Sequence, residues 1–70
     1  MAAELTVNVN GEAHAVAAGA TVAALLEQLG LAGKLIAVEV NLQLVPKPRH
    51  AEHRLAAGDR IELVTLVGGG

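Results

Sequence analysis

The first part of the chain has the polar and apolar alternation of a β-hairpin. From residue 4 to residue 9 apolar side chains alternate with polar ones, which is the period of a half-buried strand. Asn10-Gly11 follows, and this dipeptide favours a two-residue hairpin turn because both residues accept positive φ. Such a turn pairs Val9 with Glu12, and His14 on the returning strand, residues 12–17, then lies on the core-facing side near its rim.

A helix is predicted next, over residues 22–29. Apolar residues stand at positions 22, 25, 26 and 29, a spacing that places them on one helical face. Thr21 is a suitable N-cap before this run, because its hydroxyl can accept from a free backbone N–H of the first turn. Gly30 follows the last apolar position, where a glycine in a left-handed conformation commonly ends a helix.

The second half of the chain predicts three more strands. Residues 35–40 and 42–45 are apolar runs separated by the turn residue Asn41, and Pro46 and Pro48 limit the second run to a short edge strand. The polar cluster at 49–54 predicts a solvated turn or a single helical turn. Gly58-Asp59 predicts a tight turn before a last strand at 60–67. The order predicts an α+β fold with one helix on a small mixed sheet.

Composition removes several classes of protein. The 70 residues suffice for one small domain, and they include no cysteine, phenylalanine, tyrosine or tryptophan. The core must then be aliphatic, and neither disulfides nor aromatic stacking on bases is available. A net charge of −2 disfavours nucleic-acid binding. No stretch is long and apolar enough for a membrane span, and no basic leader precedes an apolar segment, so we expect a soluble cytoplasmic protein.

Catalytic and metal sites are equally poorly supported. The chain contains no serine, so no Ser-His-Asp set is possible, and no lysine follows its glycine cluster as in a phosphate-binding loop. His50 and His53 have a spacing of three, but no third ligand is near in sequence, so we interpret both as surface histidines and predict no metal site. His14 is interpreted as structural, and Asp59 as a turn residue.

The glycines Gly68, Gly69 and Gly70 follow the apolar run at 61–67 directly. Glycine weakens strands and costs the most conformational entropy on folding. We therefore expect this segment to serve the function of the chain rather than to be part of its folded domain. We predict a folded domain over residues 1–67 and a flexible tail over residues 68–70. Extended, three glycines span roughly 10 Å and pass through channels that larger residues would block. A terminal carboxylate is a poor electrophile, so its chemistry would require activation, for example by coupling to AMP.

The chain contains the segments NVNGE at 8–12, GATVAALL at 19–26, VEVN at 38–41, LVP at 44–46, AGDRIELV at 57–64 and the closing glycines. These segments, spread over essentially the full length of the chain, resemble the ThiS family, the sulfur carriers of thiamine biosynthesis. Each segment alone is weak evidence. Their order and spacing in a chain of this size are specific.

This resemblance implies a ubiquitin-like β-grasp fold and a sulfur-carrying role. In such a cycle an ATP-dependent, ubiquitin-activating-type enzyme adenylates the carboxylate of Gly70, and sulfur from a persulfide donor converts it to a thiocarboxylate. The sulfur is then delivered to thiazole synthase. The chain would bind no cofactor of its own, ATP being consumed by the partner, and it would be a cosubstrate rather than an enzyme.

The resemblance also assigns residues to roles. The family ends in two glycines, which Gly69 and Gly70 match, and Gly68 lengthens the tail by one residue. The resemblance implies that Gly68 and Gly69 thread into partner sites. It further implies an apolar partner surface near the tail, for which Val64, Leu66 and Val67 are the candidates. Because strand faces alternate, some of these must face the core.

Three other functions remain open from the residues alone. The chain could serve as a sulfur carrier for molybdopterin synthesis or tRNA thiolation, although the hairpin and helix-entry segments favour thiamine. It could be a ubiquitin-like modifier joined through Gly70 to lysines, which lysine-linked adducts would reveal. It could also be an interaction domain with an idle tail, in which case removal of Gly69 and Gly70 would leave its function intact.

Overall fold

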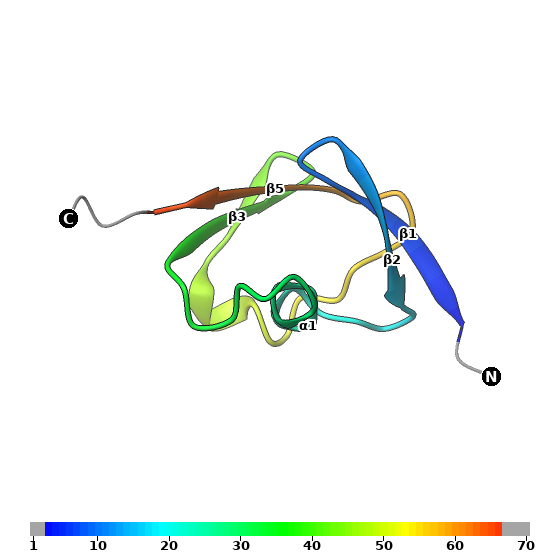
Figure 1. Ribbon diagram of the computed structural model, residues 1–70, viewed down its shortest axis with the longest axis horizontal. Coiled ribbons are helices and arrows are strands. Elements are labelled where there is room, and N and C mark those ends of the chain that lie inside the picture. Colours follow the sequence, from blue (N-terminus) through cyan, green and yellow to red (C-terminus); the bar gives the residue numbers. More distant parts are fainter. Residues whose placement is uncertain (1–2, 67–70) are drawn as a thin grey trace.

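The chain forms one mixed five-stranded sheet with a single α-helix packed against it (Figure 1). The computed structural model describes residues 3–66. Its elements are β1 (Glu4–Val9), β2 (Glu12–Ala17), α1 (Val22–Gln28), β3 (Ile36–Val40), β4 (Gln43–Val45), the 3-10 helix η1 (Lys47–Arg49) and β5 (Arg60–Thr65). This order of elements is the predicted one. The predicted domain boundary at residue 67 and the tail at 68–70 lie outside the described residues.

The first hairpin has the predicted register. β1 and β2 pair antiparallel, with Val9 opposite Glu12 and Val7 opposite His14. Asn10 and Gly11 have φ values of 49° and 89°, the two positive angles that a tight two-residue hairpin turn requires. His14 is half-buried on the core side, as the register predicted.

Helix α1 begins and ends where the sequence indicates, to within one residue. The backbone of Thr21 is extended, and its hydroxyl oxygen accepts a hydrogen bond from the backbone nitrogen of Ala24 at 3.1 Å. The helix ends at Gln28 rather than at Leu29, which forms the C-cap, and Gly30 follows with φ 74°. Among residues 3–66, no helix is long and apolar enough to cross a bilayer.

The sheet order identifies the fold. The strands lie in the order β2-β1-β5-β3-β4, with β1 and β5 parallel at the centre and the other neighbours antiparallel. The helix lies on one face of this sheet (Figure 1). A leading hairpin, one helix and a C-terminal strand inserted beside β1 make up the ubiquitin-like β-grasp fold, so the predicted fold class is confirmed.

The second hairpin and the last strand are shorter than predicted. Leu42 lies in the turn with Asn41, at φ 70° and 52°, so β4 starts only at Gln43. Leu35 precedes β3, although its carbonyl oxygen accepts a hydrogen bond from the backbone nitrogen of Leu66 at 2.8 Å. β5 ends at Thr65 rather than continuing to residue 67.

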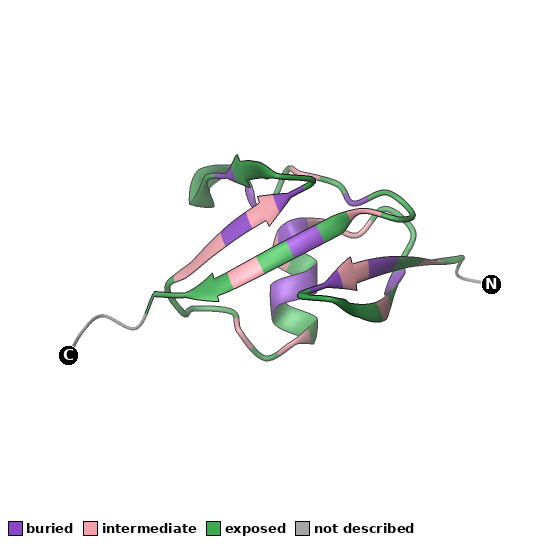
Figure 2. Ribbon diagram, turned by 90° about the horizontal axis from the view of Figure 1, so that it is seen from above, coloured by how far each residue is buried: buried purple, intermediate pink, exposed green. Residues whose placement is uncertain are grey.

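The core lies between the helix and the inner face of the sheet and is entirely aliphatic. Its buried members are Val7, Val9, Val16, Val22, Leu25, Leu26, Val38, Val40, Val45, Leu55 and Ile61. Figure 2, seen from the outer face of the sheet, shows buried and exposed positions alternating along β5. Full burial of an aliphatic side chain of this kind stabilises the folded state by about 1.5–3 kcal/mol. Valine, leucine and isoleucine can therefore form this core without aromatic residues.

One prediction about the segment between β4 and β5 is wrong. His50 is buried rather than a surface residue, and its Nε2 lies 2.9 Å from the carbonyl oxygen of Val45. The reason is local: the backbone after Pro46 turns into η1, with a proline near its start, and the turn that follows carries His50 under the helix. Backbone nitrogens of α1 complete this packing, because that of Ala23 donates to the carbonyl oxygen of His50 at 2.9 Å.

Candidate functional site

The predicted site begins at the end of β5, the central strand of the sheet. β5 pairs with β1 on one side and with β3 on the other, and it runs toward the C-terminal end of the chain, away from the helix (Figure 1). The predicted sulfur-carrying residue Gly70 and the tail residues Gly68 and Gly69 lie outside the described residues. The structure shows the strand that leads to these residues, β5.

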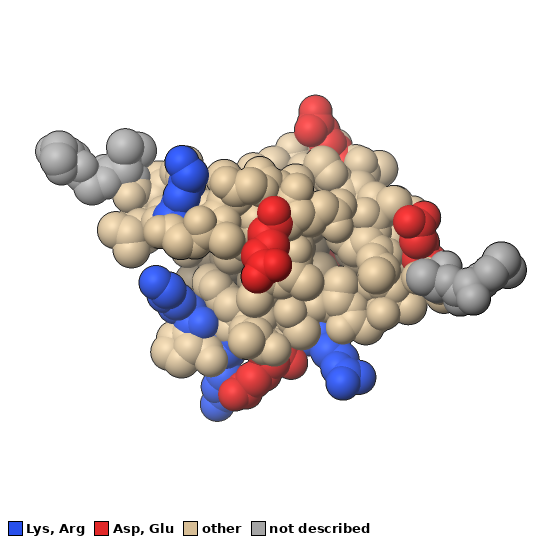
Figure 3. Space-filling model, turned by 60° about the horizontal axis from the view of Figure 1, so that its bottom comes forward, with Lys and Arg blue, Asp and Glu red and all other residues tan. Residues whose placement is uncertain are grey.

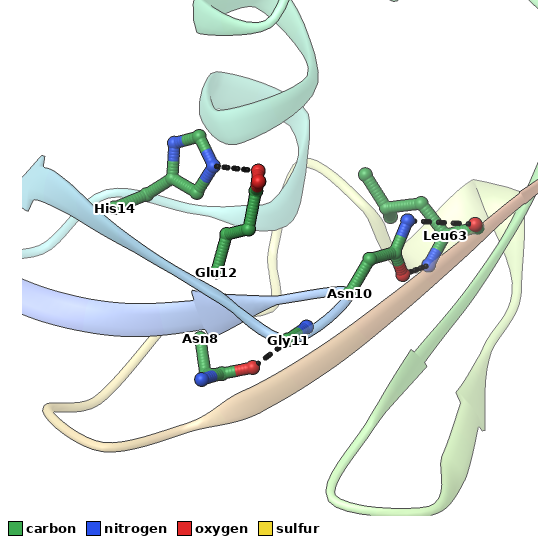
Figure 4. A network of polar contacts seen from close by, with 6 residues as sticks. All are labelled: Asn8, Asn10, Gly11, Glu12, His14 and Leu63. Atoms are coloured by element: carbon green, nitrogen blue, oxygen red, sulfur yellow. Dashed lines mark hydrogen bonds and ion pairs between the residues drawn. The ribbon is translucent and has the colours of Figure 1, made fainter.

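The side chain of Asn10 attaches the first hairpin to β5. Its Oδ1 accepts from the backbone nitrogen of Leu63 at 2.9 Å, and its Nδ2 donates to the carbonyl oxygen of Leu63 at 3.2 Å (Figure 4). The parallel pairing of β1 with β5 covers only two residue pairs, and Asn10 extends it as a strand backbone would. Sequence reasoning assigned Asn10 to the turn alone, because no local signal points to a residue 53 positions away.

A second asparagine fixes the start of β5. Oδ1 of Asn41 accepts from the backbone nitrogen of Arg60 at 2.9 Å, and Nδ2 of Asn41 donates to Oδ1 of Asp59 at 3.0 Å. The other carboxylate oxygen of Asp59 accepts from the backbone nitrogen of Ala56 at 2.8 Å. Asp59 is therefore a turn residue, as predicted. Two asparagines at positive φ thus hold β5 at its start and along its length.

The candidate partner residues lie on different sides of the molecule. Val64 points away from the core on the outer sheet face, opposite Ala37 of β3. Leu66 lines a pocket on the helix side, and Val67 lies outside the described residues. Val64 and Leu66 are 57% and 53% exposed. They remain a predicted partner surface, now divided between two faces.

Sequence reasoning missed three further exposed leucines. Leu35, Leu42 and Leu44 are 61%, 84% and 65% exposed. Alternation could have placed Leu44 outward, since its neighbour Val45 is buried, but the burial of one face is not known before the sheet is built. On the outer face Leu44 lies opposite Glu39, which in turn lies opposite Glu62.

Two titratable side chains of β2 lie close together in the described part of the chain. His14 Nε2 lies 4.0 Å from a carboxylate oxygen of Glu12, two residues before it on the same strand, β2 (Figure 4). No group of three or more histidine, aspartate or glutamate side chains is close enough to hold a metal ion in that part of the chain.

Comparisons with known proteins agree with this architecture. The chain is 41% identical over 61 residues to the sulfur carrier protein ThiS of Escherichia coli, covering 87% of this chain and 92% of that protein. A crystal structure of a thiamine biosynthesis protein (ThiS) from Geobacter metallireducens superposes with a TM-score of 0.79 at 28% identity, covering 94% of this chain and 100% of that one.

Two longer proteins are also similar. A thiazole synthase of Paramagnetospirillum magneticum is 44% identical over 62 residues, or 89% of this chain, and one of Magnetococcus marinus is 38% identical over 66 residues, or 94% of it. The matched parts make up 19% and 20% of those two proteins, so the chain spans about a fifth of their length. The sequence model of the ThiS family matches residues 6–70. The chain therefore belongs to the ThiS family.

Proposed function

We propose that the chain is a sulfur carrier for thiamine biosynthesis, with the carboxylate of Gly70 as the carrying group. The observation that carries this proposal is the match to the ThiS family over residues 6–70, together with the Escherichia coli sulfur carrier that aligns over 92% of its length. The fold supports it, because β5, the strand that leads to the tail, is paired on both sides and is held at its start and middle by two asparagine side chains.

The proposed chemistry takes place in partner enzymes. The Gly70 carboxylate attacks the α-phosphorus of ATP, and pyrophosphate leaves. The terminal sulfur of a persulfide then attacks the acyl carbon, and AMP leaves with the bonding electrons. A thiol then attacks the donor's sulfur in the remaining S–S bond, forms a disulfide with the donor and releases the thiocarboxylate with the bonding electrons. In this proposal the chain itself is a cosubstrate that binds no cofactor, and the cycle takes place in the cytoplasm.

Three partners follow from this scheme: a ubiquitin-activating-type adenylating enzyme, a persulfide donor and thiazole synthase. The last is supported by the two thiazole synthases that share a segment similar to this chain. Gly68 and Gly69 would enter the partners' sites. Residues without Cβ atoms allow a carboxylate to reach a reacting centre through a narrow channel.

Intact mass spectrometry tests the proposal. The chain is incubated with ATP, a persulfide donor and the adenylating enzyme from Escherichia coli, whose carrier is 41% identical. We expect replacement of one oxygen by sulfur at Gly70. A matched variant with one alanine added after Gly70 keeps the fold but should show no exchange. Exchange in the extended variant, or sulfur located elsewhere in the chain, would contradict the mechanism, and adducts on lysines of other proteins would favour a modifier.

A further inference from the structure

A pocket of about 400 Å³ opens on the helix side of the molecule, beside Leu66. Leu26 of α1 forms one wall, Leu31 and Leu35 of the loop between α1 and β3 form another, and His50 after η1 forms a third. Ligand-binding pockets typically enclose about 300–1,000 Å³ and are mainly apolar, so the pocket has the size and character of a binding site.

Two leucines at the pocket expose apolar surface to water. Leu35 and Leu66 are 61% and 53% exposed, and a 2.8 Å hydrogen bond from the backbone nitrogen of Leu66 to the carbonyl oxygen of Leu35 holds them together. Exposed apolar surface costs free energy unless a partner covers it, so a contiguous apolar area beside a hollow indicates an interaction site.

The charge of the pocket is opposite to that of the whole chain. Lys34 in the loop and Lys47 in η1 line it, and among residues 3–66 Glu27 is its only acidic lining residue, whereas the net charge of the chain is −2. Figure 3, which brings the helix side forward, shows basic side chains gathered on the half of this face nearer the C-terminal end. An occupant with negative charge at its ends would complement these two lysines.

His50 adds a hydrogen-bond acceptor. Its Nε2 must carry the hydrogen, because its partner, the carbonyl oxygen of Val45, can only accept. In the neutral ring Nδ1 is then an acceptor, and no described residue donates to it. His50 is among the residues that line the pocket, so a donor group of an occupant could approach its ring there. The pocket thus suits an occupant with an N–H group.

We propose that this pocket binds a short peptide segment of a partner protein in which apolar side chains are flanked by carboxylates. The apolar side chains would fill the space beside Leu35 and Leu66, the carboxylates would pair with Lys34 and Lys47, and a backbone N–H would donate to His50. This surface differs from the outer sheet face that carries Val64. It does not depend on the sulfur-carrier proposal, although it would place the partner next to the base of the tail.

Peptide titrations test the proposal on the full chain. The chain has no tryptophan or tyrosine, so the single tryptophan of a capped octapeptide, EELLWLEE, reports binding by fluorescence without background. Amide chemical shifts in ¹⁵N-labelled chain locate the site. We expect saturable binding with shifts grouped at residues 23–36, 47–51 and 66, and affinity at least about tenfold weaker for KKLLWLKK and for EESSWSEE.

Charge reversal provides the matched control. Lys34→Glu together with Lys47→Glu should weaken binding of EELLWLEE by at least about tenfold and strengthen binding of KKLLWLKK. Arg60→Glu changes an exposed charge that does not line the pocket, so it should leave the affinity within about twofold. Unchanged amide spectra away from the substitutions would show that the variants remain folded.

Four outcomes of the peptide titrations would overturn the proposal. These are shifts centred on the outer face around Leu44 and Val64, equal affinity for the acidic and basic peptides, an Arg60→Glu effect as large as that of the double variant, and no saturable binding at millimolar peptide. Octanoate serves as a competitor. Displacement of the peptide by octanoate at equal concentration would assign the pocket to small apolar acids and exclude the peptide.

Discussion

At the scale of single residues, Asn10 makes two hydrogen bonds that only an amide can make together. Its Nδ2 donates to the carbonyl oxygen of Leu63 and its Oδ1 accepts from the backbone nitrogen of the same residue. Asn10→Asp keeps the acceptor but replaces the donor with an oxygen that faces another oxygen. We expect a loss of about 1–2 kcal/mol in the free energy of unfolding, measured by urea denaturation monitored by far-UV circular dichroism.

The control for this prediction is Asn10→Gly. Glycine loses both hydrogen bonds but adopts the φ of 49° without strain and brings no repulsion. We therefore expect Asn10→Gly to be less destabilising than Asn10→Asp. An aspartate variant as stable as the parent chain would show that the amide donor contributes nothing.

The buried histidine provides the second prediction. His50→Leu keeps the apolar contacts but removes the hydrogen bond to the carbonyl oxygen of Val45, which should cost about 0.5–1.5 kcal/mol, the net contribution of a typical hydrogen bond. His50→Gln can still donate from its amide and should lose less stability. The two variants are compared by thermal unfolding. Equal losses would mean that shape, and not the hydrogen bond, determines the effect.

The same residues show how far the sequence predicts single positions. Thr21 and Asn10-Gly11 were predicted correctly because the caps and turns they form are local, set by the backbone within three residues. His50 was predicted wrongly because it lies in a polar cluster, and nothing within that cluster shows that the helix will cover it. The second role of Asn10 depends on a strand that is distant in the sequence.

At the scale of elements, the turn between β3 and β4 holds a leucine in an unfavourable conformation. Leu42 has φ 70°, and a left-handed backbone destabilises the fold by roughly 1–2 kcal/mol for a residue with a Cβ. The side chain is 84% exposed, so little packing offsets this strain. Leu42→Gly removes this strain. Glycine also raises the conformational entropy of the unfolded chain, which destabilises the folded state by about 0.4–1 kcal/mol. We expect a net gain of up to about 1 kcal/mol in the free energy of unfolding, measured in urea.

Leu44→Gly is the matched comparison. Leu44 is similarly exposed but lies within β4 at an ordinary strand angle, where glycine weakens a strand. The same substitution two residues apart should therefore act in opposite directions. A stability decrease for Leu42→Gly would show that the turn is not strained by its side chain.

The elements were predicted more completely than their arrangement. The period of two in β1 and the spacing of α1 follow from residues that are close in sequence, and the register of the first hairpin follows from its turn. The ends of β3, β4 and β5 were misplaced by one or two residues because apolar runs do not show where hydrogen bonding stops. The insertion of β5 beside β1 has no local signal, and the β-grasp order came from the family resemblance.

At the scale of the whole molecule, the two faces beside the tail differ in charge and shape. The helix side has a hollow with Lys34 and Lys47, while the outer sheet face carries Leu44, Val64 and the cross-strand pair Glu39 and Glu62. Like charges directly opposite on neighbouring strands disfavour the sheet. A partner that covers the outer face would relieve this by supplying basic side chains between its apolar contacts.

The last prediction concerns this outer face and depends on the proposed function. Val64 lies one residue before the end of β5, so an enzyme that receives the tail would contact it. Val64→Lys should lower kcat/KM for thiocarboxylate formation by about tenfold or more, as expected when an interface anchor is lost, with an unchanged melting temperature. Ala13→Lys places the same charge on the same face, at the β2 edge, and should have an effect below about twofold. If both variants lose activity equally, the added charge and not the position is responsible, and Val64 is not a partner contact.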